Sequence, residues 1–126
     1  MASPNDRKYA ATHEWHKLDD KQVTIGLSRF AVDKLTDITY LEVTRTDGAV
    51  AGGDALGEIE SVKGASDIYT AVAGQIVAVN QAVLDDPAII NQDPYDKGWI
   101  IKIQVQDESQ LDSLMTSEQY DQSHDR

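Results

Sequence analysis

The sequence predicts a mainly β fold, a sandwich of two strand layers or a small barrel with a few short helices. The pattern from residue 9 to about residue 105 is mainly one of short strands, rich in β-branched and aromatic residues and separated by Gly, Asp and Asn. Only two stretches have the spacing of apolar residues that is typical of helices. Many short strands with few helices are typical of antiparallel sandwiches and barrels.

The strand predictions rest on alternation and on residue type. Residues 22–27 alternate with a period of two, which places Val23, Ile25 and Leu27 on one face. Three further segments have a β-rich composition, namely 38–43, 75–80 and 99–105.

The two predicted helices lie on either side of most of these strands. Ser28 is expected to cap a short helix that carries Phe30 and Leu35. Residues 107–120 have apolar residues at i, i+3 and i+4, with Ser117 available to start a further turn. We expect one domain over residues 1–126, with flexible tails at 1–8 and 121–126.

Composition excludes several classes of function. The 126 residues carry a formal net charge of −11, which argues against binding to nucleic acids and to anionic membranes. There are no cysteines, so disulfides and cysteine metal sites are excluded, and any redox chemistry needs a cofactor. No membrane span or signal sequence is recognisable, and a cytoplasmic protein is expected. His13 and His16 have the wrong spacing for a helical zinc motif, so no metal site is predicted.

One lysine lies at the centre of a symmetric segment. Gly52 precedes Lys63 by eleven residues and Gly74 follows it by eleven, with strand-like arms between them. Gly64 permits the positive φ that a tight turn often needs. Lys63 is therefore expected at a hairpin tip, where it is either accessible to a modifying enzyme or simply solvated.

Several motifs make the chain similar to a known family. The run GEIESVK at 57–63, with SDIY at 66–69 and GQIV at 74–77, resembles the lipoyl-attachment signature. Tyr9 followed by HEW at 13–15 resembles the N-terminal motif of the H-protein family of the glycine cleavage system. Further matching segments extend the resemblance over roughly residues 9–120: TIGL at 24–27, DPY at 93–95, GWI at 98–100 and the C-terminal helical region.

The chain departs from that family at a few positions. The family usually has Ala where this chain has Gly64, and Pro and Ser where it has Ala71 and Ala73. A common Leu-Pro-Glu-x-Gly turn is replaced by VTRTDG at 43–48. These departures leave the attachment motif intact, but they leave open which partners the chain serves.

The resemblance implies a lipoyl/biotinyl-type barrel-sandwich hybrid with lipoate joined to Lys63 as an amide. The extended arm would reach roughly 14 Å from the backbone. The chain would then be a carrier and not an enzyme. It would take an aminomethyl group from a pyridoxal-phosphate glycine decarboxylase to a tetrahydrofolate-dependent aminomethyltransferase, and return to dihydrolipoamide dehydrogenase for reoxidation.

The same resemblance implies roles for four other residues. Glu60 and Gly74 correspond to positions that the lipoate-attachment enzyme reads. Glu14 and Asp67 correspond to carboxylates that hold the aminomethylated arm, because an ammonium group gains from a nearby carboxylate. All four are also compatible with ordinary structural or solvated positions. A monomer is expected.

Alternative functions remain at this point. A lipoate carrier on the same scaffold could serve sulfur oxidation or a lipoate relay. A biotin carrier lacks support, because the usual Met-Lys-Met is replaced by Val62-Lys63-Gly64. An enzyme that uses Lys63 as a Schiff-base nucleophile would need that lysine in a dry pocket. An unmodified interaction module is the remaining possibility.

Overall fold

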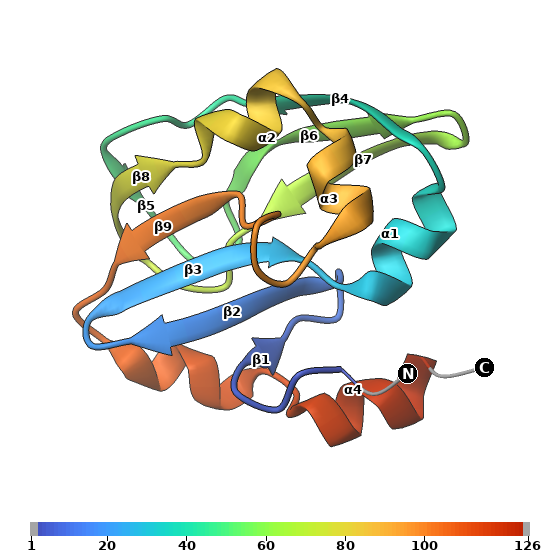
Figure 1. Ribbon diagram of the computed structural model, residues 1–126. Coiled ribbons are helices and arrows are strands. Elements are labelled where there is room, and N and C mark those ends of the chain that lie inside the picture. Colours follow the sequence, from blue (N-terminus) through green and yellow to red (C-terminus); the bar gives the residue numbers. More distant parts are fainter. Residues whose placement is uncertain (1–2, 125–126) are drawn as a thin grey trace.

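The computed structural model describes residues 3–124 and contains two antiparallel sheets that face each other (Figure 1). The larger sheet consists, in spatial order, of β1 (Lys8–Tyr9), β2 (Glu14–Asp19), β3 (Gln22–Leu27), β9 (Ile101–Gln104), β8 (Gly74–Val79) and β5 (Ala49–Val50). The smaller sheet consists of β4 (Ile38–Val43), β6 (Ala55–Ser61) and β7 (Gly64–Tyr69). The predicted mainly β fold with a few short helices is confirmed.

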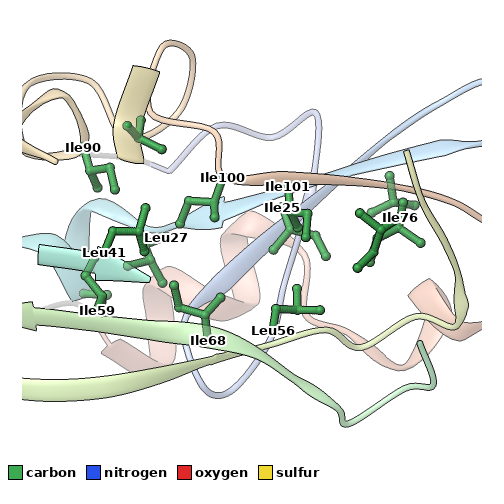
Figure 2. Packing of buried hydrophobic residues seen from close by; sticks show 14 of the residues in the cluster. Ile25, Leu27, Leu41, Leu56, Ile59, Ile68, Ile76, Ile90, Ile100 and Ile101 are labelled. Atoms are coloured by element: carbon green, nitrogen blue, oxygen red, sulfur yellow. The ribbon is translucent and has the colours of Figure 1, made fainter. Parts of the chain in front are cut away.

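Both sheets contribute to one hydrophobic core. Val23, Ile25 and Leu27 are at most 4% exposed, which confirms the predicted inner face of β3. Ile59 and Ile68 of the smaller sheet belong to the same buried cluster. Figure 2 shows Ile25 and Leu27 of the larger sheet facing Ile59 and Ile68 of the smaller one. Because burying such a side chain stabilises a fold by roughly 1.5–3 kcal/mol, this layer is the main force that holds the sheets together.

The helices lie at the edges of the sandwich. They are α1 (Arg29–Leu35), α2 (Gln81–Asp85), α3 (Ala88–Gln92), the 3-10 helix η1 (Glu108–Ser113) and α4 (Ser117–His124). The cap predicted for α1 is confirmed, since the Ala31 N–H donates to Ser28 Oγ at 3.2 Å. The five-residue helices α2 and α3 were not predicted, because such short segments have no measurable apolar period. Within residues 3–124, no helix has the length and apolar character that crossing a bilayer requires.

A single helix over residues 107–120 is not what the structure shows. The backbone of Met115 exchanges two hydrogen bonds with Tyr9 of β1, at 2.8 and 2.9 Å. This pairing interrupts the helical region between η1 and α4, because Met115 has to be extended to meet a strand. Residues 121–124, expected to belong to a tail, lie in α4, where the Asp121 carboxylate accepts hydrogen bonds from Ser3. Residues 125–126 lie outside the described part.

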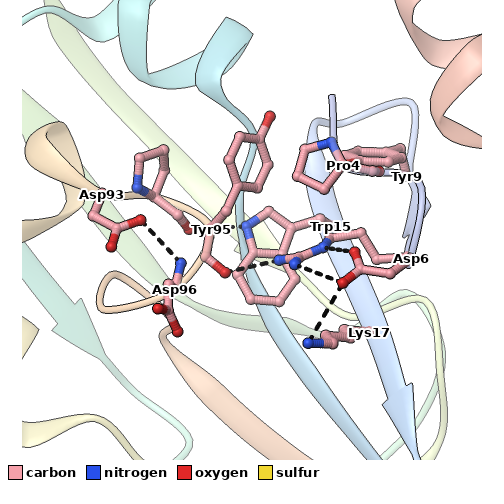
Figure 3. Close-up of polar contacts among 10 residues, drawn as sticks. Pro4, Asp6, Tyr9, Trp15, Lys17, Asp93, Tyr95 and Asp96 are labelled. Atoms are coloured by element: carbon pink, nitrogen blue, oxygen red, sulfur yellow. Dashed lines mark hydrogen bonds and ion pairs between the residues drawn. The ribbon is translucent and has the colours of Figure 1, made fainter. Parts of the chain in front are cut away.

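The segment before β1 is held against the larger sheet. The Arg7 guanidinium lies 4.6 Å from the Trp15 ring centroid and 5.4 Å from that of Tyr95. It also pairs with Asp6 at 2.7 Å, and the Trp15 indole N–H donates to the Pro94 carbonyl at 3.0 Å. Figure 3 shows Trp15 and Tyr95 meeting beside Asp6. These contacts fix the start of β2, which contributes to the site described next.

Candidate functional site

Lys63 lies at the tip of the β6–β7 hairpin, as predicted. Ser61 and Gly64 are the last paired residues, so Val62 and Lys63 form the turn. Gly64 has a φ of 152°, a value that glycine tolerates best. The Lys63 N–H donates to Ser61 Oγ at 3.1 Å, while the side chain is exposed. The turn projects from one end of the molecule (upper right in Figure 1). Because Lys63 is exposed, it lacks the dry surroundings that a Schiff-base lysine needs.

The base of the hairpin is fixed to β2. Ile68 is 1% exposed in the core. The Tyr69 N–H donates to Glu14 Oε2 at 3.0 Å. Just beyond β7, the Ala71 N–H donates to His16 Nε2 at 3.1 Å, a bond that proline at this position would lack. Two buried side chains of the larger sheet therefore hold the strand that carries the tip.

A cavity of about 180 Å³ lies between the hairpin, α1 and the turn before β2. Its apolar wall consists of Leu27, Ala31, Leu35 and Ile59. Its polar residues are Thr12, His13, Lys34 and Ser66. Ser66 is three residues from Lys63 along an extended strand, a separation of about 10 Å. A lysine-plus-lipoyl arm of roughly 14 Å would reach this cavity, and the apolar wall suits its hydrocarbon and sulfur atoms.

Glu14 is fully buried and is hydrogen-bonded to Thr12, which lines this cavity. The Thr12 hydroxyl donates to Oε1, and the Tyr69 N–H donates to Oε2. Burial raises the pKa of Glu14, and these hydrogen bonds partly oppose the rise. Because Thr12 itself lines the cavity, a cation placed there would have a carboxylate one side chain away. The interpretation of Glu14 as an ordinary solvated carboxylate is wrong.

Asp67 has a different environment. Ser66 lines the cavity, and neighbouring strand residues point to opposite faces, so Asp67 lies on the outer face of the smaller sheet. Its Oδ2 accepts a hydrogen bond from the Tyr69 hydroxyl at 3.2 Å, which raises the pKa of Tyr69. Glu14 and Asp67 therefore contact the backbone and the side chain of the same tyrosine from different directions.

The outer face of the smaller sheet is strongly acidic. Glu58 on β6 lies directly opposite Glu42 on β4 and directly opposite Asp67 on β7. Glu60 projects from the same face two residues further along β6, between Tyr40 and Ala65 in the paired register, and is exposed. Within the described residues, no ion pair neutralises any of these four carboxylates. Like charges in directly opposite positions destabilise a sheet.

Gly74 lies on β8 of the other sheet, opposite Val50 of β5. A Cβ atom at this position would come within 2.1 Å of the Gln104 carbonyl oxygen and 2.7 Å of Ile103 Cγ2. Glycine is therefore required by the close packing of β8 on β9. Packing alone therefore explains why glycine occupies position 74, whether or not an attachment enzyme contacts it.

The sequence did not single out the polar residues around the cavity as a site. Ala31 and Leu35 are spaced i, i+4 on α1, and Lys34 lies on the same side, so the helical period carried a weak signal. His13 was considered as a metal ligand and as part of the N-terminal motif, but not as part of a cavity. In the part of the chain described, no three His, Cys, Asp or Glu side chains come together as a metal site would require. Contacts between segments distant in sequence assemble this cavity, and no local motif reports them.

Comparisons with known proteins agree with this geometry. A family model for the glycine cleavage H-protein matches residues 7–126. The chain is 46% identical over 117 residues to the glycine cleavage system H protein of Alcanivorax borkumensis, covering 93% of this chain and 91% of that protein. It is 41% identical over 120 residues to the H protein of Staphylococcus epidermidis, covering 95% of each chain.

A solved structure shows the same fold. The crystal structure of a glycine cleavage system H protein from Mycobacterium marinum superposes with a TM-score of 0.87 and 36% sequence identity. The match covers 95% of this chain and 97% of that one. From the family match, the relatives and the shared fold, we conclude that the chain belongs to the glycine cleavage H-protein family.

Proposed function

We propose that this chain is the lipoate-bearing carrier of glycine cleavage and that Lys63 is the attachment residue. One observation carries the proposal. In a chain of the H-protein family, an exposed lysine lies on a hairpin tip, and a lysine-plus-lipoyl arm would be long enough to reach a partly apolar cavity. The Ser61 hydroxyl supports the backbone of the turn, so the Lys63 Nζ remains available to a lipoate-attachment enzyme.

The chain presents the arm and supplies no catalytic group of its own. Lipoate on Lys63 would supply a disulfide that accepts the aminomethyl group and two electrons at the pyridoxal-phosphate glycine decarboxylase, and that is left as a dithiol for dihydrolipoamide dehydrogenase to reoxidise once the tetrahydrofolate-dependent aminomethyltransferase has taken the one-carbon unit. The hairpin base fixes where the arm begins, because Glu14 and His16 both bind the backbone just below it. A fixed origin raises the effective concentration of the arm at each docked active site.

The cavity serves as the resting place of the arm between partners. Leu27, Leu35 and Ile59 exclude water from the far end of the arm. Thr12, with Glu14 behind it, offers hydrogen bonding and negative charge to the ammonium group that the loaded arm carries. Asp67 adds negative charge from the outer face of β7 and favours the loaded arm as it leaves the cavity.

Glu60 and Gly74 act at the attachment step. Glu60 is exposed three residues before Lys63 on the acidic face, where an attachment enzyme approaching the tip would contact it. Gly74 acts indirectly, because it permits the close packing of β8 on β9 in the larger sheet.

Transfer of the aminomethyl group tests this function. The chain is lipoylated by a lipoate-attachment enzyme and incubated with glycine decarboxylase and glycine, and its intact mass is measured. We expect the mass to increase by one aminomethyl group. Lys97→Arg, which changes another exposed turn lysine, should behave as wild type, whereas Lys63→Arg should accept neither lipoate nor the aminomethyl group.

Two failures would have different meanings. A lipoylated chain that never accepts the aminomethyl group would exclude glycine cleavage and leave a lipoate carrier for another pathway. Lys63→Arg protein that still takes up lipoate would exclude Lys63 as the attachment site.

A further inference from the structure

The link between α1 and β4 contains a residue in a strained backbone conformation. Thr36 follows the last residue of α1 and has a φ of 60° and a ψ of −133°. Glycine adopts this conformation readily, but a side chain that is branched at Cβ makes it costly. Such strain persists only where surrounding contacts hold the backbone in place.

One side chain binds the link on both sides of the strained residue. The Asn91 Nδ2 donates to the Thr36 carbonyl oxygen at 2.6 Å, and Asn91 Oδ1 accepts the Ile38 N–H at 3.0 Å. An asparagine amide offers a donor and an acceptor, so both ends of this side chain are used. These two hydrogen bonds, from one residue of α3 to the link, form the Asn91 clamp.

The residue that makes the clamp is itself held from two directions. Its neighbour Ile90 is fully buried in the core. The Asn91 carbonyl oxygen accepts a hydrogen bond from Arg29 Nη1, at the start of α1, at 2.8 Å. The end of α3 is therefore bound to both ends of α1, and the clamp has a firm support.

The clamped link binds the turn that carries Lys63. The carbonyl oxygen of Asp37 accepts the Val62 N–H at 3.1 Å. Figure 1 shows the tip of the β6–β7 hairpin beside the connection from α1 to β4. The Lys63 N–H, in contrast, donates within the hairpin to Ser61 Oγ. One amide of the turn is thus bound from the body of the protein, and the next amide is bound locally.

The same link meets the hairpin at a second point. Ile38 is paired with Ser61, the last residue of β6 before the turn, and the register of the two strands shifts between Ile38 and Tyr40. A register shift disrupts the ladder locally, so this end of the pairing depends on support from outside the sheet. The Asn91 clamp supplies that support, because it holds the Ile38 N–H.

We propose that Asn91 is a positioning residue for the Lys63 turn, and that its clamp holds the strained Thr36 so that the link fixes the Val62 backbone in the form that a lipoate-attachment enzyme binds. Only the last step rests on the proposed function, since the hold on Val62 needs no lipoate. The proposal gives α3, which contributes no residue to the cavity beside the hairpin, a role in presenting the lysine.

Hydrogen exchange at two neighbouring amides tests the hold on the unmodified full-length chain. In Asn91→Ala, the Val62 N–H should exchange with water roughly three- to tenfold faster than in wild type, the range expected for the loss of one hydrogen bond. The Lys63 N–H should keep its wild-type rate, because its acceptor lies within the hairpin. Both rates are measured by NMR under conditions in which each variant is folded.

Asn80→Ala is the matched control. Asn80 also binds backbone groups of a distant segment, since its Nδ2 donates to the carbonyl oxygens of Lys97 and Trp99 at 2.9 and 2.8 Å. Its loss should lower overall stability and leave the exchange of the Val62 N–H near the wild-type rate. Equal acceleration in Asn80→Ala and Asn91→Ala would overturn the proposal, because general loosening would then explain both.

A rescue separates positioning from packing. Glycine at position 36 adopts the backbone conformation without strain, so the link should no longer need the clamp. The double variant Thr36→Gly, Asn91→Ala should therefore exchange the Val62 N–H within about twofold of the wild-type rate. Thr36→Ser, which keeps a Cβ atom, should not rescue Asn91→Ala. Failure of Thr36→Gly to rescue would show that the clamp does not act through the strained residue.

The rate of lipoate attachment tests the last step. It is followed by intact mass over a range of carrier concentrations, which separates the KM of the attachment enzyme for the chain from its kcat. Asn91→Ala should raise this KM roughly two- to tenfold and leave kcat within about twofold, because a turn that is not preorganised must be ordered on binding. Thr36→Gly should restore the KM in the double variant.

The outcomes distinguish this proposal from the proposed function. If wild type takes no lipoate on Lys63, the proposed function and the presenting role both fail, and the exchange rates alone decide whether the clamp holds Val62. If wild type is lipoylated but the Val62 N–H of Asn91→Ala exchanges at the wild-type rate, the function stands and the role of Asn91 is overturned. Faster exchange with an unchanged KM would overturn the presenting role alone.

Discussion

The two ends of the β6–β7 hairpin differ sharply in how they are held. At the tip, residues 62–67 are all exposed, and Ser61 supplies the side-chain hydrogen bond to the turn. At the base, Ile68 lies in the core, and the backbone beyond it is bound by Glu14 and His16. The difference shows how a small fold can present a reactive side chain to large partners, because the rigid base determines where an accessible tip lies.

The largest effect is expected at the base. Ile68→Ala removes a side chain that is 1% exposed and should lower the free energy of unfolding by about 2–5 kcal/mol, because it leaves a cavity between the sheets. Val62→Ala is the matched change at the tip, where the valine is 67% exposed. It should change the free energy of unfolding by no more than about 0.5 kcal/mol. Urea denaturation followed by circular dichroism measures both. Equal losses would show that the tip is as firmly packed as the base.

The buried His16 should make the base sensitive to acid. Burial lowers the pKa of His16 from 6.5 to about 4, so between these pH values the unfolded chain binds a proton that the folded chain does not. Relative to His16→Gln, which still offers an acceptor to the Ala71 N–H, wild type should lose about 3 kcal/mol as the pH falls from about 6.5 to about 4.

The comparison with His16→Gln isolates this histidine. Glu14 has a raised pKa, so its contribution to stability increases as the pH falls, opposite to that of His16. Because Glu14 is present in both proteins, its contribution cancels in the difference between their free energies of unfolding. Denaturation midpoints measured across this pH range give the difference. A constant difference between the two proteins would contradict a neutral, buried His16.

On β8 of the larger sheet, Gly74→Ala should lower the free energy of unfolding by about 1–3 kcal/mol, because the new Cβ meets the Gln104 carbonyl. Gln75→Ala changes the exposed neighbouring position on β8. It should alter the free energy of unfolding by no more than about 0.5 kcal/mol. Thermal unfolding and the rate of lipoate attachment to the folded protein are measured together. Gly74→Ala protein of wild-type stability that no longer accepts lipoate would show a direct role in recognition instead.

The smallest effect is expected on the acidic face near the tip. Glu58→Gln removes the central charge of the row formed with Glu42 and Asp67 and should stabilise the protein by roughly 0.2–1 kcal/mol at low salt. The gain should shrink at high ionic strength because of screening. Glu108→Gln is the opposite control, since it removes an exposed ion pair with Lys21 and should give no gain. A salt-independent gain would rule out charge repulsion.

The sequence was most informative where local pattern determines structure. Alternation in β3, the cap at Ser28 and the turn at Lys63 are each decided by a few neighbouring residues, and all are confirmed. It was least informative where distant segments meet. The break at Met115 depends on pairing with Tyr9, more than a hundred residues earlier, and no local period reports it.

The candidate site shows the same difference between features set by local sequence and features set by distant contacts. Lys63 stands out because its spacing and motif are local. The burial of Glu14 depends on Tyr69 and Thr12, and the Asn91 clamp depends on the link between α1 and β4. The periodicity of a sequence cannot distinguish a buried carboxylate that is hydrogen-bonded between two sheets from one that is exposed to water.

The intact mass of the protein purified from its native host, followed by mapping of the modified peptide, tests the central claim most directly. We predict one lipoyl group on the turn that contains Lys63, and none in Lys63→Arg protein from the same host. Fully processed native protein with an unmodified Lys63, or with lipoate on another lysine, would contradict the account.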